Sequence, residues 1–507
     1  MGSHHFERTE QTVSENKHKK AQEEKHSNVK YAVVGALSVV LVAFLLVWNT
    51  GIIQRNAAAV TVDGEKYSAA DVQYYLRSLM LQNGISSTSS LKSMTMNSTT
   101  GETMYDYLKS QAVERLVTCA ALDKQAAEEG FTMSDDTQTE VDDQLKQLEE
   151  QWVSAGYQSR DAFIRANYGP YMTYDRLVEL FTRDMRVNEY STQFSDGLSY
   201  SDADYEQYYQ ENANTLDEYT ITQFVFNATV DTTDADGNTI EMTDDEKSAA
   251  LEQAKTEKQA RAQELQSKLE AGEDPAQLAQ EYADDLTGDP SISQVMSGSS
   301  VASSSYAQWA QDTARQKGDV TLSEYDAGPS SYYYYVVRFE GRARNDENTA
   351  TVRHILVAAD QDEGASEPTE DQYAAAKTKA EELLDQWKSG AATEESFAEL
   401  AKANSADTGS AADGGLITDI YSGSGYVSTF TDWALDAARQ PGDTGIVQNT
   451  GSSVKGWHIM YFVGRDGDPV WKLTAKTAME NNDYTDWQNA AKDKVSYTTS
   501  FGLKFVQ

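Results

Sequence analysis

The stretch DWALDAARQPGDT, residues 432–444, has a near copy in QWAQDTARQKGDV, residues 308–320. The segments upstream of the two copies are also similar in sequence: PAQLAQEYADD (275–285) parallels FAELAKANSAD (397–407). Self-similarity at a nearly constant offset marks a repeated structural unit. The repeat therefore predicts two successive domains of one fold, each of about 120 residues.

Each copy of the repeat has the same order of elements: a strand, two helices, a short helix and a closing strand. The opening strands are TITQFVF (220–226) and VRHILV (352–357), and the closing strands are VVRFEGR (336–342) and IMYFVGR (459–465). The segment RARNDENT (342–349) joins the two copies. Strands mixed with helices in this order predict an α+β fold for each copy.

Before the repeat, the sequence predicts a helical domain that opens with a hairpin. In VTVDGEKYS (60–68), Asp63 and Gly64 separate two short strand-like runs, and Ser68 is placed to cap the next helix. Apolar residues then recur at helical spacing over residues 103–129, 135–155, 160–168, 172–195 and 202–212. After the repeat, residues 471–495 have the pattern of a further helix. We expect that helix to fold back onto the helical domain.

The N-terminal region contains a candidate membrane anchor. Residues 31–48 (YAVVGALSVVLVAFLLVW) carry no charge, and this length is enough to cross a bilayer. Lys and Arg are more frequent before the segment than after it, which places the N-terminus in the cytoplasm and the bulk of the chain outside. A cleaved signal peptide, with Ala57–Ala59 as the small-residue site, is the alternative. The length of the apolar stretch favours an uncleaved anchor.

Charge and cysteine content narrow the possible functions. The 507 residues include 81 acidic and 42 basic side chains, for a net charge of -39. Nucleic-acid binding needs Lys and Arg to displace counterions, so the balance argues against a nucleic-acid partner. The lone cysteine, Cys119, cannot form an internal disulfide, and its apolar neighbours predict a small buried side chain.

Two histidines stand out because they lie in apolar, strand-like segments. The other four are His4, His5, His18 and His26, all in the polar N-terminal tail.

The two remaining histidines are His354, in the opening strand of the second copy, and His458, in its closing strand. The first copy has Gln223 and Tyr335 at the matching places. The strands therefore do not need histidine to form, and this difference indicates a function for the second copy.

Other kinds of site find less support in the sequence. A zinc site needs three or four ligands, and His354, His458 and Asp407 would be the minimum, with no fourth candidate. The G-x-S-x-G elbow of serine hydrolases is missing from the sequence, as is a Gly-rich phosphate loop. The sequence thus gives no indication of a metal or a cofactor.

Residues 349–466 resemble a parvulin-type peptidyl-prolyl cis/trans isomerase. The resemblance is carried by RHILV (353–357), FAELAKANSAD (397–407), GGL (414–416), STFTDWAL (428–435), PGDTGIV (441–447) and GWHIMYF (456–462), in this order. It implies a four-stranded antiparallel sheet wrapped by helices, and an enzyme that works without a cofactor.

The resemblance also assigns roles to individual residues. His354 and His458 match the paired histidines of the family, and Asp407 matches its Cys-or-Asp position. Leu416, Tyr426 and Phe430 match the apolar wall that holds the substrate's proline ring. The chain departs from the family pattern at Tyr426, where Met is usual, and by extra residues before Phe430.

In the first copy, the repeat assigns Gln223, Asp285 and Tyr335 as degenerate counterparts of the three catalytic positions. The loop after RHILV is acidic (DQDEGASEPTED), so selectivity for phosphoserine is not expected.

The order of the segments is similar to that of extracytoplasmic foldases of the SurA, PrsA and PpiD kind. On this basis we expect an α+β multidomain chain. Its parts are a cytoplasmic tail (1–30), a transmembrane anchor (31–53), a SurA-like helical chaperone domain (56–216), a degenerate parvulin-like domain (217–345), a parvulin domain (346–467) and a C-terminal helix that packs on the chaperone domain (468–507).

The resemblance implies a membrane-anchored foldase that isomerises X-Pro bonds in exported, proline-containing polypeptides at the cell surface or in a periplasm. Its partners would be these unfolded clients and, through residues 31–53, the lipid bilayer. The alternative function is a non-catalytic holdase with vestigial parvulin modules. The sequence leaves open whether the chain forms a homodimer.

Overall fold

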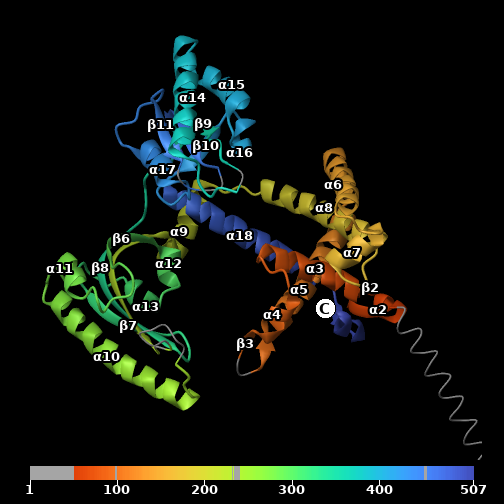
Figure 1. The fold of residues 1–507 in the computed structure, drawn as a ribbon, viewed down its shortest axis with the longest axis horizontal. Coiled ribbons are helices and arrows are strands. Elements are labelled where there is room, and N and C mark those ends of the chain that lie inside the picture. The colour runs from red at the N-terminus through yellow and green to blue at the C-terminus, as the bar shows by residue number, and fades with distance from the viewer. Residues whose placement is uncertain are drawn as a thin grey trace, which may run out of the picture. The chain divides into compact units, whose positions relative to one another are not determined.

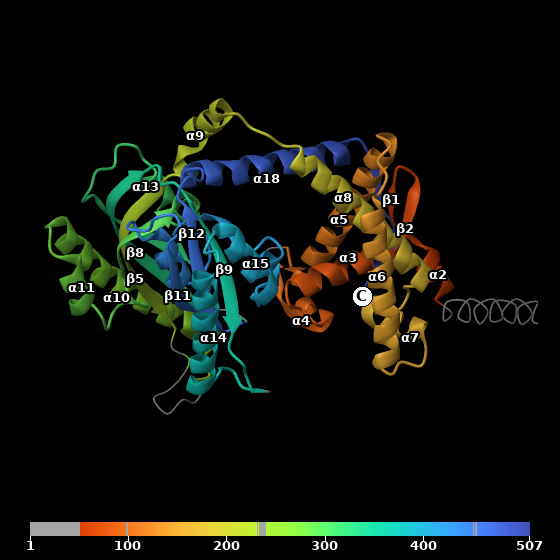
Figure 2. The same cartoon turned by 90° about the horizontal axis from the view of Figure 1, so that it is seen from above.

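The computed structural model describes residues 51–507 except 98–99, 231, 233–239, 363, 450 and 452–453. The chain divides into two compact units, which are described separately below. One unit comprises the chain up to Leu198 together with Glu480–Gln507, and the other comprises Ser199–Met479. Figure 1 labels their helices and strands, and Figure 2 shows the same elements from above.

The first unit is mainly helical, as the sequence predicts. Its elements are α2 (Ile52–Asn56), β1 (Ala58–Val62), β2 (Glu65–Ser68), α3 (Ala69–Gln82), α4 (Thr88–Ser93), β3 (Thr95–Asn97), β4 (Glu102–Thr103), α5 (Met104–Glu128), α6 (Asp135–Ser154), α7 (Arg160–Tyr168) and α8 (Tyr174–Asp196). The Ser68 N–H donates a hydrogen bond to the Asp71 carboxylate, 2.6 Å away, which caps the start of α3. Cys119 is buried in α5, as expected for a small apolar side chain.

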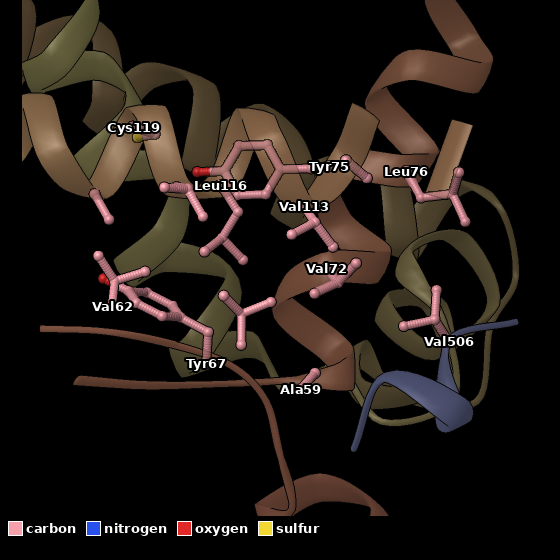
Figure 3. Close-up of a cluster of buried hydrophobic side chains, with 14 of the residues drawn as sticks. Ala59, Val62, Tyr67, Val72, Tyr75, Leu76, Val113, Leu116, Cys119 and Val506 are labelled. Atoms are coloured by element: carbon pink, nitrogen blue, oxygen red, sulfur yellow. The ribbon is translucent and has the colours of Figure 1, made fainter. Parts of the chain in front are cut away.

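The core of the first unit is assembled from segments far apart in the sequence. Figure 3 shows side chains from β1, β2, α3 and α5 that meet at this core, and among them are Val62, Tyr67, Val72, Leu76, Val113 and Leu116. Val506, near the end of the chain, belongs to the same cluster. Burial of these apolar side chains is the main favourable contribution to the stability of the unit.

The last residues of the chain complete the first unit. Helix α18 (Val470–Asp493) packs Trp487 and Ala491 on this core, so the expected return of the C-terminal helix is confirmed. A short strand, β13 (Tyr497–Thr499), then pairs antiparallel with β1, and the 3-10 helix η1 (Phe501–Phe505) follows. Strand β13 was not predicted from the sequence, because three exposed residues show no apolar alternation.

The second unit holds α9 (Asp202–Leu216) and two four-stranded antiparallel sheets. The first sheet has the order β6-β5-β8-β7, and the second has the order β10-β9-β12-β11. The strands of the first sheet are β5 (Glu218–Thr229), β6 (Ser291–Ser297), β7 (Val320–Asp326) and β8 (Ser331–Ala343). Those of the second are β9 (Ala350–Ala358), β10 (Leu416–Ile420), β11 (Thr444–Asn449) and β12 (Gly456–Gly464).

Helices pack on both faces of each sheet. In the first copy they are α10 (Asp244–Glu270), α11 (Pro275–Glu281), α12 (Gly298–Ala302) and α13 (Ala307–Ala310). In the second copy they are α14 (Glu370–Ser389), α15 (Glu394–Asn404), α16 (Thr408–Ala411) and α17 (Ser428–Leu435). The long helices α10 and α14 pack on β5 and β8 and on β9 and β12, respectively (Figures 1 and 2). The helical domain and the sheet-containing repeats that the sequence predicts are thus confirmed.

The expected membrane anchor falls mostly outside the part of the chain that the structure describes. Residues 31–50 of the anchor and the whole tail at 1–30 are not among the described residues. Within the described residues, no helix combines the length and the apolar character that crossing a membrane requires.

Candidate active site

The two histidines of the second copy meet on one face of its sheet. His354 lies on β9 and His458 on the neighbouring strand β12, where it is paired in register with Leu356. Because side chains alternate along a strand, His354 and His458 project to the same face and lie diagonally across the two strands. Their Nδ1 atoms are 3.1 Å apart, and both side chains are buried.

Asp407 extends this contact into a chain of three side chains. It caps the short helix α16, with its carboxylate accepting from the Gly409 N–H at 3.1 Å. Asp407 Oδ2 is 2.9 Å from His354 Nε2, so the order of the chain is Asp407, His354, His458. The structure therefore brings together the three residues that the resemblance assigns as catalytic.

Ser410 is a member of the site that was not predicted from the sequence. Its hydroxyl donates to Asp407 Oδ2 at 2.6 Å and lies 3.1 Å from His354 Nε2. A serine three residues after a helix-capping aspartate lies on the first helical turn, near the capping carboxylate. Ser410 could therefore have been predicted from its position three residues after Asp407.

The hydrogen-bond partners define the protonation pattern of the neutral pair. An ionised carboxylate only accepts, so His354 donates from Nε2 to Asp407. Nδ1 of a neutral His354 is then an acceptor, and His458 must donate from its own Nδ1. This assignment leaves His458 Nε2 unprotonated, as a hydrogen-bond acceptor.

The pKa values fit this pattern. Burial lowers the pKa of His354, although the charge of Asp407 acts in the opposite direction. Burial, together with the neighbouring His354, lowers the pKa of His458 to about 3. Burial acts to raise the pKa of Asp407, but hydrogen bonds from Ser410 and the Gly409 N–H and the interaction with His354 bring it below its ordinary value. At neutral pH the site thus contains two neutral imidazoles and one carboxylate.

Phe430, on α17, packs against both imidazoles. Its ring centroid lies 5.4 Å from that of His354 and 5.2 Å from that of His458, with both ring pairs near perpendicular. The centroid of the Tyr426 ring lies 5.2 Å from that of Phe430. Phe430 is only 2% exposed, whereas Tyr426 is 43% exposed, so Tyr426 forms the outer layer of the site.

Leu416 is not brought to the same cluster. In the register of β10 with β9, Leu416 lies opposite Arg353, and Ile417 lies opposite Val352. Alternation therefore places Ile417 on the face of the sheet that carries His354, and Ile417 packs with Phe430. Of the three residues expected to form the apolar wall, Tyr426 and Phe430 thus lie together, while Ile417 rather than Leu416 lies on their face of the sheet.

The glycine pair before Leu416 is explained by a close backbone approach. The Gly415 carbonyl accepts from the His354 N–H at 2.8 Å, and Gly415 has a φ of 70°. A Cβ at this position would lie 2.0 Å from the His354 carbonyl oxygen. The GGL motif thus allows β10 to lie directly beside the strand that carries His354.

In the first copy, polar side chains of another kind occupy the matching positions. Gln223 pairs with Val337 and Val225 with Tyr335, in the same register as His354 and His458 with their partners. Gln223 thus holds the place of His354, and Tyr335 holds the place of His458. The repeat aligns Tyr306 with Phe430, and the Tyr306 hydroxyl donates to Gln223 Oε1 at 2.7 Å.

Asp285 does not hold the place of Asp407, and this assignment from the repeat is wrong. The Thr287 N–H donates to the Val225 carbonyl, as the Ala406 N–H donates to the Leu356 carbonyl, each at 2.8 Å. Thr287 is thus equivalent to Ala406, and the next residue, Gly288, takes the position of Asp407. The sequence alignment missed this because the segment 275–287 is longer than the equivalent segment 397–406.

Asp285 instead forms ion pairs with Lys258 and Arg261 of α10. Within the part of the chain that the structure describes, no cluster of three or more His, Cys, Asp or Glu side chains is arranged to hold a metal ion.

Two family models match the chain. The model described as PPIC-type PPIASE domain matches residues 354–464, and the model described as SurA-like N-terminal domain matches residues 22–191. The first match covers the two histidines and Asp407, and the second ends within α8 of the helical unit. No curated protein matches the chain.

Several solved structures are similar to parts of the chain. Peptidylprolyl isomerase PrsA from Bacillus anthracis is 21% identical, with 30% of this chain and 59% of that chain covered and a TM-score of 0.19. PrsA from Bacillus subtilis is 15% identical, with 80% and 87% covered and a TM-score of 0.27. Foldase protein PrsA from Streptococcus pneumoniae is 13% identical, with 81% and 92% covered and a TM-score of 0.26.

The fraction of each solved chain that this chain covers differs between these structures. The chain spans 59% of the length of the Bacillus anthracis protein, and 53% of the length of a SurA-like chaperone from Campylobacter jejuni. At these TM-scores, the likenesses support no statement about the activity of this chain.

Proposed function

Because this chain combines a PPIC-type peptidyl-prolyl isomerase domain with a SurA-like N-terminal domain, we propose that it is an extracytoplasmic foldase that isomerises X-Pro bonds in exported polypeptides. The observation that carries the proposal is the hydrogen-bonded chain of Asp407, His354 and His458 beneath Phe430 and Tyr426. The second copy, residues 346–467, is the catalytic part in this proposal.

The reaction makes and breaks no covalent bond. The barrier of about 18–20 kcal/mol arises from amide resonance, which is lost when the C–N bond is twisted halfway. A site that binds the twisted amide better than the planar amide lowers this barrier. The twisted amide is the less dipolar of the two, so an apolar surround favours it.

The proposed roles follow from the positions of the side chains. Phe430 and Tyr426, with Ile417 behind them, hold the proline ring. The neutral pair of His354 and His458 forms the floor and fixes the position of Phe430. Asp407, whose side chain is 32% exposed, faces the substrate carbonyl and repels the planar amide oxygen more than the twisted one. Because Phe430 is almost fully covered, a proline ring reaches it by displacing Tyr426.

A proline-peptide isomerisation assay on the full chain tests this proposal. The double variant His354→Ala, His458→Ala should lose most of the activity, because it removes the floor on which Phe430 rests. The matched control is Gln223→Ala, Tyr335→Ala at the equivalent positions of the first copy, which should keep the wild-type rate. Full activity in the histidine double variant would refute the assigned roles.

A holdase function is the second candidate, and a cavity in the helical unit favours it. The cavity has a volume of about 640 Å³ and is lined in part by Met80, Leu81, Leu148, Phe163 and Phe181. Leu81, one of the lining side chains, is 76% exposed and therefore accessible to a client. Suppression of aggregation of a client without proline separates the two activities, because an isomerase alone gives no protection there.

We also propose that residues 31–53 anchor the chain in a membrane, with residues 1–30 in the cytoplasm. The charge asymmetry around the uncharged segment supports this orientation. The full chain should remain with membranes after alkaline carbonate washing, while a chain lacking residues 1–53 should be released. Release of both would contradict the anchor.

A further inference from the structure

The first parvulin-like copy contains a run of four tyrosines, Tyr332 to Tyr335, on β8. Alternation along the strand divides them between the two faces of the sheet. Tyr332 and Tyr334 pack towards α10 in the core of the copy. Tyr333 and Tyr335 project to the opposite face, where Gln223 holds the place of the catalytic histidine.

The tyrosines of this second face form a continuous row with two others. The Tyr325 and Tyr333 ring centroids are 6.4 Å apart, those of Tyr333 and Tyr335 are 6.3 Å apart, and those of Tyr335 and Tyr306 are 6.3 Å apart. We call Tyr306, Tyr335, Tyr333 and Tyr325 the tyrosine row. It begins at buried Tyr306, which is bonded to Gln223, and ends at Tyr325, which is 51% exposed.

The second copy has nothing comparable at the outer two positions. Tyr325 pairs with Tyr333 in the first copy. At the equivalent positions of the second copy, Asn449 pairs with Gly456, so neither tyrosine has an aromatic counterpart. The fold therefore does not need aromatic rings at these two places. The rings are also not explained by burial, since Tyr333 is half-buried and Tyr325 is more exposed.

We propose that the tyrosine row binds an extended, proline-containing segment of a client polypeptide without isomerising it. The inference rests on the proposed function, since it gives the first copy the same class of client as the second. The row starts where the second copy would hold its proline ring, and continues outward over the sheet.

The chemistry of the row fits such a segment. Flat aromatic faces with a polar hydroxyl at the edge recognise Pro-rich chains, whose polyproline II conformation is already extended and loses little entropy on binding. An extended chain advances about 6–7 Å for every two residues, which is close to the spacing of the rings. Successive rings can therefore contact one segment at points about two residues of rise apart.

The same positions lack the groups that the proposed isomerase site uses. Gln223 and Tyr335 replace the imidazoles, and Gly288 stands where Asp407 would supply a carboxylate. Asp285 is engaged by Lys258 and Arg261 on α10. Binding without catalysis is therefore expected of the first copy.

The test uses the full chain and an Ala-Pro dodecapeptide that carries a photoreactive diazirine at one end. After irradiation, labelled positions are mapped by mass spectrometry, so the two copies are distinguished. We expect labels within 306–335 as well as near Phe430. In the variant Tyr325→Thr, Tyr333→Thr, binding at the first copy should weaken on the order of tenfold, because two stacked rings are lost. Threonine retains a high preference for strands.

Two controls separate ring contacts from a general effect on the sheet. Tyr325→Phe, Tyr333→Phe keeps both rings and should bind like the wild type. Tyr332→Thr makes the same replacement on the opposite face of β8 and should leave labelling unchanged. The isomerisation rate should be equal in all of these variants, because none of them alters the second copy.

Several results would overturn the inference. They are labels confined to the second copy, equal labelling by an Ala-Ser dodecapeptide, or equal affinity in the threonine double variant. Failure of the proposed function gives a different result, because the wild-type chain would then lack isomerase activity while labelling of the tyrosine row persisted.

Discussion

At the scale of single residues, the site depends on two buried imidazoles that stay neutral. Both pKa values lie below the ordinary histidine value, so the unfolded chain binds protons that the folded chain does not. The stability of the second copy is therefore fully retained above about pH 6.5. It decreases as the pH falls from there towards the folded-state pKa of His458, about 3. His458 contributes a slope of about 1.4 kcal/mol per pH unit in this range, and His354, whose pKa is also lowered, acts in the same direction.

This dependence can be measured with a variant that lacks both groups. The thermal midpoint of the second copy should fall more steeply between pH 6.5 and pH 4.5 in the wild type than in His354→Gln, His458→Gln. The four other histidines lie in the N-terminal tail and are common to both proteins. Parallel slopes would show that the imidazoles do not carry the acid sensitivity.

Ser410 gives a second prediction at this scale. Its hydroxyl is the leading hydrogen bond that lowers the pKa of Asp407, so Ser410→Ala should raise that pKa. The acid limb of the pH profile of isomerisation should then move to higher pH, because Asp407 is protonated earlier. Thr408→Ala, at an exposed neighbouring position, should leave the profile in place. A fall in rate without a shift of the profile would indicate a purely structural role for Ser410.

The histidines and Asp407 could be predicted from the sequence, whereas other members of the site could not. His354 and His458 were distinguishable because the repeat supplies Gln223 and Tyr335 as a comparison. Asp285 was assigned wrongly because sequence alignment does not reveal which backbone group reaches the Val225 carbonyl. The choice between Leu416 and Ile417 depends on strand register, which a single sequence does not fix.

At the scale of elements, the close approach of β10 to β9 makes a direct prediction. Gly415→Ala should destabilise the second copy by more than about 3 kcal/mol, because its Cβ would overlap the His354 carbonyl. Gly442 also has a positive φ, of 94°, but a Cβ added there would meet no atom within 4 Å. Gly442→Ala should therefore cost only about 1–2 kcal/mol, the usual penalty for a residue with a side chain at positive φ. Urea unfolding, monitored by hydrogen exchange of the β9 amides, measures the loss of stability in both variants.

The outer strands of the two sheets show which elements a sequence reveals. The central strands β5, β8, β9 and β12 are apolar, and each was located from its sequence. The edge strands β7 and β11 are mostly half-buried along their length and show no clear alternation of apolar and polar residues. They were expected only through the family resemblance, because the repeat pattern alone indicated two strands in each copy.

At the scale of the whole molecule, the residues after α18 should matter for the helical unit. The Tyr105 hydroxyl donates to the Val506 carbonyl at 2.8 Å, and the Gln507 N–H donates to Gln73 Oε1 at 2.7 Å. Deletion of residues 496–507 should lower the thermal midpoint of this unit and reduce holdase activity. Lys504→Ala, at an exposed position, is the matched control and should change little. An unchanged midpoint after the deletion would show that β13 and η1 are dispensable.

The pairing of β13 with β1 also sets a temporal order for the chain. Asp63 and Ser496 are hydrogen-bonded although they are 433 residues apart. Because contacts between distant residues form only after the intervening chain is available, β13 can complete the sheet of β1 and β2 only after almost the entire polypeptide has emerged. Each parvulin-like copy, whose contacts are local by comparison, can form earlier. A partly emerged chain would then present its proposed isomerase site before its helical unit is closed.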